Sequence, residues 1–426
     1  MALACGPLLP QPPSWFPGHM MKFTRMLPAL LTRTDVVLEI RDSRLPLTSI
    51  NRTLEGALRK WRAERGWSPH DPTLRVSANS PCERIIVFNK SDQVPEWGME
   101  PFRQSMSARF PGQQFMFASL HKPRHIRQLN QSLVNIAKEY PHNTELNVLV
   151  IGMPNVGKST LLNALRNMGI QGPTPKAFQT SAQPGLTRAL STRLKLSLEP
   201  PVYAFDTPGV MLPYLGQGQT GAERGVKLAL IAGIKEGMYD METLSAYLLY
   251  RLNVLNPISP AYLTLLPQGS APTVDLEEFL TLLAKRMGMV RRGEGFDLSR
   301  AAAYFVRWWR EDGATIYAQS TISSPSQEVK EGPDFQIHHP ANSLFPFAIR
   351  LGICGWGFDL QWSMNPGEVL TTAVVQQKMD ACIGEYLQRV EREESDEDAI
   401  SPTQRKKRAM IEEKRRRAAK WSHLKT

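Results

Sequence analysis

Short apolar runs alternate with amphipathic segments along the first half of the chain. Four largely apolar runs have the length of buried strands: residues 36–40, 84–88, 115–119 and 147–151. Residues 194–198 and 202–205 are predicted to form a strand pair. Apolar residues recur with helical spacing in three segments between these runs: residues 20–31, 126–140 and 160–166. This alternation of strands and helices predicts an α/β domain.

The second half of the chain is predicted to be helical at first and then less regular. Helical patterns at residues 223–255 and 274–312 indicate a small helical domain. Residues 61–82 contain three prolines and scattered polar residues, which is typical of a surface insertion. We therefore expect five segments: 1–14, disordered or targeting; 15–222, the α/β domain; 223–315, the helical domain; 316–388, a linker and an extension of unknown fold; and 389–426, an acidic and then basic disordered tail.

Composition and charge favour a globular protein with a polyanionic partner. The chain of 426 residues is 42% hydrophobic and 21% charged, which is enough to bury a core in two or three domains. Its net charge is +11, and its C-terminal residues 401–426 carry ten Lys or Arg against two Glu. A segment of this kind stays solvated and either reaches phosphates or serves as a nuclear localisation signal.

The helical domain has two interpretations. Arginines are interleaved with aromatic residues there: Arg286, Arg291, Arg292, Arg300, Arg307 and Arg310 with Phe296, Phe305, Trp308 and Trp309. This pattern is typical of a nucleic-acid-binding surface, and equally of a helical bundle with a solvated charged face. These residues alone leave both interpretations open, and the domain expected at residues 223–315 is a helical RNA-binding domain.

Compartment signals are few. Four cysteines stand far apart without disulfide or metal spacing, which favours a reducing compartment, and no apolar run reaches 18 residues. The first 34 residues lack Asp and Glu, as mitochondrial transit peptides do. Residues 1–14 are Pro-rich and contain no Arg, so composition alone favours an ordinary disordered N-terminus.

The strongest motif is a phosphate-binding loop at residues 152–159. It has the spacing G-x-x-x-x-G-K-[ST] between a predicted strand and a predicted helix. The glycines let backbone N–H groups wrap phosphates, Lys158 reaches the β- and γ-phosphates, and the Ser159 hydroxyl is available to Mg²⁺. The residues predicted to contact nucleotide here are Gly152, Asn155, Val156, Gly157, Lys158, Ser159 and Thr160.

An N-K-x-D motif follows the predicted strand at 84–88. The Asp92 carboxylate can accept hydrogen bonds from the N1–H and 2-amino groups of guanine, which adenine does not supply. Asn89 and Lys90 can brace the base and tie this loop to the phosphate loop. Ser119 ends a further predicted strand in a loop whose backbone N–H groups can meet the guanine oxygen.

Two further elements complete a nucleotide-sensing set. Residues 183–188 contain Thr187, the candidate hydroxyl for the magnesium shell, with Thr180 as the weaker alternative. Residues 206–209 form a D-x-x-G motif in which Asp206 would hold Mg²⁺ and the Gly209 N–H would meet the γ-phosphate. The base-reading motif precedes the phosphate loop, whereas a Ras-like domain has it last. The predicted fold is therefore a circularly permuted Ras-like P-loop domain followed by the helical domain.

Taken together, these motifs resemble the circularly permuted GTPases that assemble ribosomes. The resemblance covers residues 15–312 and includes the N-terminal W-F-P-G-H-M signature at residues 15–20. It also includes R-D-S-R-L-P at residues 41–46, which departs from the family's D-A-R-x-P at Ser43. Within the family, the chain is most similar to the mitochondrial branch, which acts on the large ribosomal subunit.

The resemblance implies a catalytic set and a mechanism. Water would attack the γ-phosphate, and Lys158, Thr187 and Gly209 would act with Mg²⁺. Val210 stands where a Ras-type enzyme carries its water-orienting glutamine, so something else must complete the site. The resemblance assigns K⁺ to Asn155 and water positioning to His19, against the alternative that His19 only packs in an N-terminal turn.

The resemblance also implies partners and a location. It implies a monomer that binds GTP, GDP and the rRNA of the large subunit in the mitochondrial matrix, including peripheral contact with the inner membrane. The alternatives are a nucleotide-gated rRNA-binding module with negligible turnover, an ATPase with an accidental N-K-x-D, and a nucleolar or cytoplasmic assembly GTPase.

Overall fold

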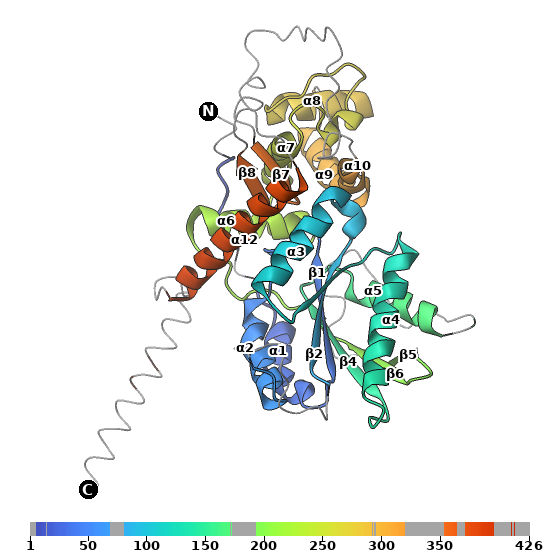
Figure 1. Cartoon of the computed structure of the whole chain (residues 1–426). Helices are drawn as coiled ribbons and strands as arrows, with labels where there is room; N and C mark the ends of the chain where they lie inside the picture. Colours follow the sequence, from blue (N-terminus) through green and yellow to red (C-terminus); the bar gives the residue numbers. More distant parts are fainter. Residues whose placement is uncertain are drawn as a thin grey trace.

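A six-stranded sheet forms the centre of the chain (Figure 1). The computed structural model describes residues 6–13, 15–68, 81–170, 172, 193–291, 293, 295–319, 353–363, 371–395, 410 and 413. The strands are β1 (Val36–Asp42), β2 (Glu83–Asn89), β3 (Gln114–Phe117), β4 (Leu146–Gly152), β5 (Leu194–Ser197) and β6 (Val202–Asp206). Their order is β3-β2-β1-β4-β6-β5, and the only antiparallel pair within this sheet is β5 with β6.

The strand order confirms the predicted circular permutation. The phosphate-loop strand β4 lies between β1 and β6, with the base-reading strand β2 beyond β1. Helix α4 (Pro123–Glu139) leads from β3 into β4 and so joins the base-reading part to the phosphate loop. The sheet thus places the same strands side by side as a Ras-like domain, although the chain enters it at a different point.

Helices cover both faces of this sheet, as the continuous apolar strands require. Val36, Leu38 and Ile40 pack in one cluster with α4 and α5 (Lys158–Gly169). Val37 faces the other way and packs with α1 (Gly18–Leu31) and α2 (Arg52–Glu64). Helix α3 (Met99–Arg109) covers β2 on that second face. Short 3₁₀ turns lie between β2 and α3: η1 (Ser91–Gln93) and η2 (Glu96–Gly98).

The helical domain follows β6, and its first boundary differs from the expected one. Its elements are α6 (Gly218–Leu230), α7 (Met241–Leu255), η3 (Ala261–Leu265), α8 (Leu276–Met287), α9 (Leu298–Trp308), the π-helical η4 (Trp309–Gly313) and α10 (Ala314–Ala318). The expected boundary between residues 222 and 223 falls inside α6. The helix begins five residues earlier than the helical pattern indicated, and Gly221 allows close packing there, since a Cβ would lie 2.4 Å from the Gly216 oxygen.

The aromatic residues of the helical domain belong mainly to its core. Phe305, Trp308 and Trp309 are buried, so these three rings are not available to stack on bases. Arg310 donates to the carbonyl oxygens of Ala229 and Leu230 at 2.9 and 3.0 Å. Arg286 likewise donates to backbone carbonyls, whereas Arg291, Arg300 and Arg307 are exposed. Arg292 lies outside the described residues.

The C-terminal part contains packed structure where a linker and a tail were expected. Strands β7 (Ile353–Trp356) and β8 (Leu360–Ser363) form a hairpin, and α12 (Thr372–Ser395) lies along α3 and beside α6 (Figure 1). The tail was expected to begin at residue 389, but α12 continues to Ser395. An apolar stripe anchors this helix, and Glu393 extends its contact by pairing with Arg52 and Arg224 at 3.2 Å each.

The predicted insertion at residues 61–82 also starts later than expected. Its first residues form the last turn of α2, where Trp61 is buried. Residues 69–80 lie outside the described part of the chain. Among the residues that the structure describes, no helix combines the length and apolarity needed to cross a membrane.

Candidate guanine-nucleotide site

The phosphate loop has the backbone conformation that its glycines were predicted to permit. Gly157 has φ of +92°, and a Cβ on it would lie 2.5 Å from the Asn89 side-chain nitrogen. A Cβ on Gly152 would lie 2.3 Å from the Ile40 oxygen. Only glycine therefore fits at either position. The loop turns tightly between β4 and α5 and lies against both β1 and the base-reading loop.

Lys158 begins α5 and is buried in the loop. Its Nζ donates to the Met153 carbonyl oxygen at 3.0 Å, so the ammonium lies inside the ring of backbone that would surround phosphates. Burial lowers the pKa of Lys158 to about 8, against the opposing charge of Asp206. The lysine is thus a cation with little solvation, which favours an anionic ligand beside it.

Ser159 and Asp206 bring two oxygen donors together. The Ser159 hydroxyl donates a short hydrogen bond to Asp206 Oδ2. The Thr207 hydroxyl donates to the Val150 oxygen at 2.7 Å and so joins the end of β6 to β4. Burial raises the pKa of Asp206, while Lys158 and Ser159 oppose this shift. A hydroxyl and a carboxylate in contact are the donor types that Mg²⁺ prefers, so the residues present fit that ion. Thr187, Thr180 and the rest of residues 173–192 lie outside the described part.

The base-reading loop is hydrogen-bonded to the phosphate loop. Asn89 Nδ2 donates to the Val156 oxygen, and Lys90 Nζ donates to the Asn155 oxygen, both at 2.8 Å. These are the ties that the N-K-x-D pattern predicted. Lys90 has φ of 60°, a left-handed conformation that turns the chain after β2. Asp92, in η1, is partly exposed.

The loop after β3 lies beside the N-K-x-D loop. The Ser91 N–H donates to the Ala118 oxygen at 2.9 Å, which brings the segment containing Ser119 next to the predicted base site. Ser119 is buried, and its hydroxyl accepts from the His121 N–H at 3.0 Å. The structure thus brings together the base-reading residues that lie 27 positions apart in the sequence (Asp92 and Ser119).

Sequence reasoning missed the role of Asp42 and Arg44. Asp42 ends β1 and lies 3.2 Å from Lys90 Nζ, while Arg44 donates to both of its oxygens at 2.9 and 2.8 Å. Burial would raise the pKa of Asp42, but the charges of Arg44 and Lys90 outweigh it and hold the pKa below its usual range. The sequence feature that could have indicated this role is a charged turn directly after a buried strand. That pattern does not show that Lys90 is the partner of Asp42.

The D-x-x-G segment packs against the phosphate loop. A Cβ on Gly209 would lie 2.6 Å from backbone atoms of Pro154, and the Val210 N–H donates to the Gly152 oxygen at 3.1 Å. Val210 is buried in the cluster under α1, so its side chain does not face a nucleotide. His19, in the first turn of α1, is half-buried. Its neighbour Met20 accepts through sulfur from the Met211 N–H at 3.5 Å, which places this turn beside the D-x-x-G segment.

The permuted sheet and the four loops at one of its edges define a P-loop GTPase of the circularly permuted class. Comparison with known proteins agrees. Residues 147–248 match the family model described as 50S ribosome-binding GTPase. The chain is 31% identical to Mitochondrial GTPase 1 of Schizosaccharomyces pombe over 303 residues, which cover 70% of this chain and 87% of the relative. It is 30% identical to Mitochondrial ribosome-associated GTPase 1 of Xenopus tropicalis, over 65% of this chain and 81% of the relative.

The chain therefore belongs to the mitochondrial GTPase 1 family, and it is a GTPase. Among solved structures, GNP-bound YlqF from T. maritima aligns with 69% of this chain and 94% of its own, with a TM-score of 0.42 and 20% identity.

Proposed function

We propose that this GTPase acts in the assembly of the large subunit of the mitochondrial ribosome, and that ribosomal particles stimulate its hydrolysis of GTP. The observation that carries the proposal is the family: relatives of 30–31% identity along most of their own length are named mitochondrial or ribosome-associated GTPases. The match to a model described as 50S ribosome-binding supports the large subunit. The net charge of +11 suits an RNA-rich partner.

At the nucleotide, the chain's own residues would bind and orient. Asp92 would accept from guanine, with Asn89 and Lys90 holding its loop against the phosphate loop. Lys158 would leave the Met153 oxygen and donate to the β- and γ-phosphates, and the Gly209 N–H would donate to the γ-phosphate. Ser159, Asp206 and Thr187 would hold Mg²⁺, which neutralises charge on the phosphates when bound.

Activation would depend on groups other than a glutamine after Gly209, because Val210 is apolar and buried. His19 would position the attacking water from the first turn of α1. Asn155 would hold K⁺ beside the transferred phosphoryl group. Its backbone carbonyl accepts from Lys90 Nζ at 2.8 Å, so the same residue would link the base loop to this ion. The proposed location is the mitochondrial matrix, with peripheral contact to the inner membrane, and the proposed state is a monomer.

The deciding experiment measures GTP turnover by the full chain with and without purified mitochondrial large subunits. We expect slow turnover alone and a rise on adding subunits. A slow rate that subunits leave unchanged would favour a nucleotide-gated binding module, and equal competition by ATP would overturn the guanine assignment. Asp92→Asn should shift preference from guanine to xanthine nucleotides, because an amide replaces the carboxylate acceptor.

Two refinements test the activating groups and the partner. Turnover in potassium should exceed turnover in sodium at equal ionic strength, and Asn155→Ala should remove the difference. His19→Ala should lower the stimulated rate while leaving GTP affinity nearly unchanged. RNA crosslinking in cells should recover mitochondrial large-subunit rRNA, whereas recovery of nuclear-encoded rRNA would move the proposal to the nucleolus or cytoplasm.

A further inference from the structure

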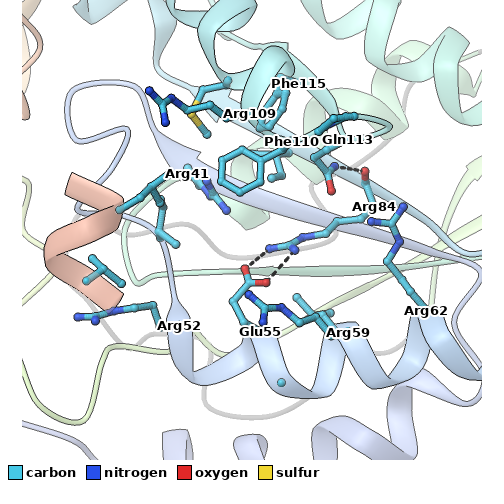
Figure 2. A pocket seen from close by; sticks show the side chains of 18 of the residues that line it. Arg41, Arg52, Glu55, Arg59, Arg62, Arg84, Arg109, Phe110, Gln113 and Phe115 are labelled. Carbon is cyan, nitrogen blue, oxygen red and sulfur yellow. Dashed lines mark hydrogen bonds and ion pairs between the residues drawn. The ribbon is translucent and has the colours of Figure 1, made fainter. Parts of the chain in front are cut away.

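A cavity opens on the sheet face that carries α2 and α3, away from the nucleotide loops. Its volume is about 560 Å³, within the range of sites that hold a small molecule or one unit of a polymer. In Figure 2, α2 borders it on one side with Arg59 and Arg62, and Phe110 and Phe115 stand opposite. None of the residues predicted to contact GTP lines this cavity.

The floor of the cavity is charged, which is unusual for a face of a parallel sheet. Arg84 on β2 donates to Glu39 and Glu55, both at 3.0 Å, and Arg41 donates to Glu39 at 2.6 Å. Both faces of such a sheet are normally apolar. A buried ionic network is on average no more stabilising than apolar packing of the same volume, so stability alone does not account for it. These two arginines and two glutamates give the cavity a polar floor.

The floor's charges balance one another, so the charge available to a ligand lies elsewhere. Six arginines and two glutamates line the cavity. Arg52 and Arg109 pair with acidic residues of α12 at 3.2 and 2.7 Å. Arg59 is exposed, and none of the described carboxylates forms an ion pair with it. The unbalanced positive charge therefore lies at Arg59, on the rim formed by α2.

Flat apolar surface lies next to this charge. Arg62, one turn from Arg59, stacks 4.0 Å from the centre of the Trp67 ring. Phe110 directly follows α3 with 37% of its surface exposed, and Met106 and Leu387 complete the wall. Cationic groups beside exposed aromatic faces are the combination that binds single-stranded nucleic acid, because phosphates meet the cations while bases stack on the rings.

We propose that the cavity between α2 and α3 binds one unpaired nucleotide of single-stranded RNA, with its base against Phe110 and its phosphate at Arg59. This site rests on the proposed function, which supplies RNA as the partner. A base-paired helix keeps its bases stacked internally and has none to insert, so the cavity selects single strands, loops or bulges. The site would mark where the GTPase reads an exposed base on its RNA partner.

The test measures binding of a fluorescein-labelled single-stranded oligoribonucleotide of mixed sequence to the full chain, with the GTP site filled by a non-hydrolysable analogue. Phe110→Ala should weaken binding about tenfold, since loss of one stacked base costs ~1–3 kcal/mol. Arg59→Glu should weaken binding about as much, because it replaces the cation at the phosphate by an anion. Lys60→Glu is the matched control. It makes the same charge change one residue along α2, at a side chain that is 76% exposed and does not line the cavity. Its effect on binding should stay within about threefold, which is typical of a change in an exposed surface charge.

Other outcomes separate the cavity from the proposed function. Equal losses in Lys60→Glu and Arg59→Glu would reduce the site to a diffuse basic surface, and unchanged binding in both cavity variants would overturn it. Tighter, Phe110-dependent binding of an acidic aromatic peptide would replace RNA by a protein partner. Suppose that wild-type protein associates with large subunits and that the cavity variants bind the oligoribonucleotide as tightly as wild type does. In that case only the cavity assignment fails. If wild-type protein does not associate with subunits, the proposed function fails. Unchanged GTP turnover in each variant shows that the fold is retained.

Discussion

The two halves of the nucleotide-binding edge are held in different ways. In the base half, around β1, β2 and β3, support comes from a segment more than 250 residues away: Trp356 donates to the Pro95 oxygen at 2.9 Å and stacks on Phe102 with ring centres 5.1 Å apart. In the phosphate half, around β4, β6 and α5, support comes from groups of the same half, apart from the bonds that Asn89 and Lys90 donate to the phosphate loop. Lys158 donates to Met153 and Ser159 to Asp206.

The hairpin that braces the base half also contacts the helical domain. Asp359 accepts from the Leu47 and Thr48 N–H groups at 2.9 and 2.7 Å, and the neighbouring Phe358 stacks on Trp309 with ring centres 5.1 Å apart. The base half and the helical domain are thus packed around one common element. In the phosphate half, Lys158 and Ser159 are held by hydrogen bonds to Met153 and Asp206, and a bound nucleotide with its metal ion would have to replace these bonds. We therefore expect changes in the base half to cost mainly stability, and changes in the phosphate half to cost mainly activity.

The largest expected effect is on stability, from Asp42→Asn. This side chain is fully buried between Arg44 and Lys90, so neutralising it leaves two cations facing each other without an anion. Breaking a buried pair in this way costs about 3–5 kcal/mol in the free energy of unfolding. Urea denaturation measures the loss, and GTP affinity should fall with it because Lys90 loses its partner. An unchanged midpoint would mean that the base half does not depend on this network.

Lys158→Met should have the opposite profile. Removing one preorganised cation from the transferred phosphoryl group should lower single-turnover hydrolysis by about 100- to 1,000-fold. The melting temperature should not fall, because burial already disfavours the charged lysine and methionine has a similar length. A loss of stability as large as that of Asp42→Asn would remove the distinction between the two halves.

Asp359→Asn tests the brace itself. The carboxylate accepts three hydrogen bonds from Leu47 and Thr48 and lies 3.4 Å from Lys227, so weakening it should cost about 1.5–3 kcal/mol of stability with turnover largely kept. Asp380→Asn is the matched control. Asp380 lies on α12 and its pair with Arg109 is half exposed, so the change should cost less than about 1 kcal/mol. Equal losses would mean that the hairpin contributes nothing beyond a surface ion pair.

The sequence predicted the nucleotide edge because its motifs encode local backbone requirements. Gly152 and Gly157 stand where a Cβ would collide with Ile40 and Asn89, and the spacing between them is fixed by the turn. The order of the motifs along the chain was enough to predict the permutation, and the strand order confirms it. The roles assigned to individual site residues stay predictions.

The C-terminal packing could not be predicted, because its contacts have no local pattern. Thr48 and Asp359 are 311 residues apart, and nothing in either neighbourhood indicates the other. In the helical domain, the spacing of Phe305, Trp308 and Trp309 fits a core as well as a nucleic-acid surface. Only burial distinguishes the two, and these three residues are buried. The same ambiguity hid the cavity beside α3, whose Phe110 carries no motif.

The last and smallest expected effect is a pH dependence of stability, which rises with pH over an acid range for the base half and over an alkaline range for the phosphate half. The pKa of Asp42 lies below its usual range in the folded chain, so the stability it supplies is complete above pH 4 and is lost as pH falls further. The pKa of Lys158 is lowered from 10.5 to about 8, so above pH 8 the unfolded chain binds one more proton than the folded chain. Stability should therefore rise between pH 8 and 10.5, while GTP affinity falls by up to about tenfold per pH unit because the neutral amine must regain its proton to bind phosphate. Calorimetric titration with GTP and urea denaturation across this range measure both. Lys158→Met should abolish the alkaline rise in stability and leave the acid loss unchanged; an alkaline rise that persists in this variant would assign it to another group.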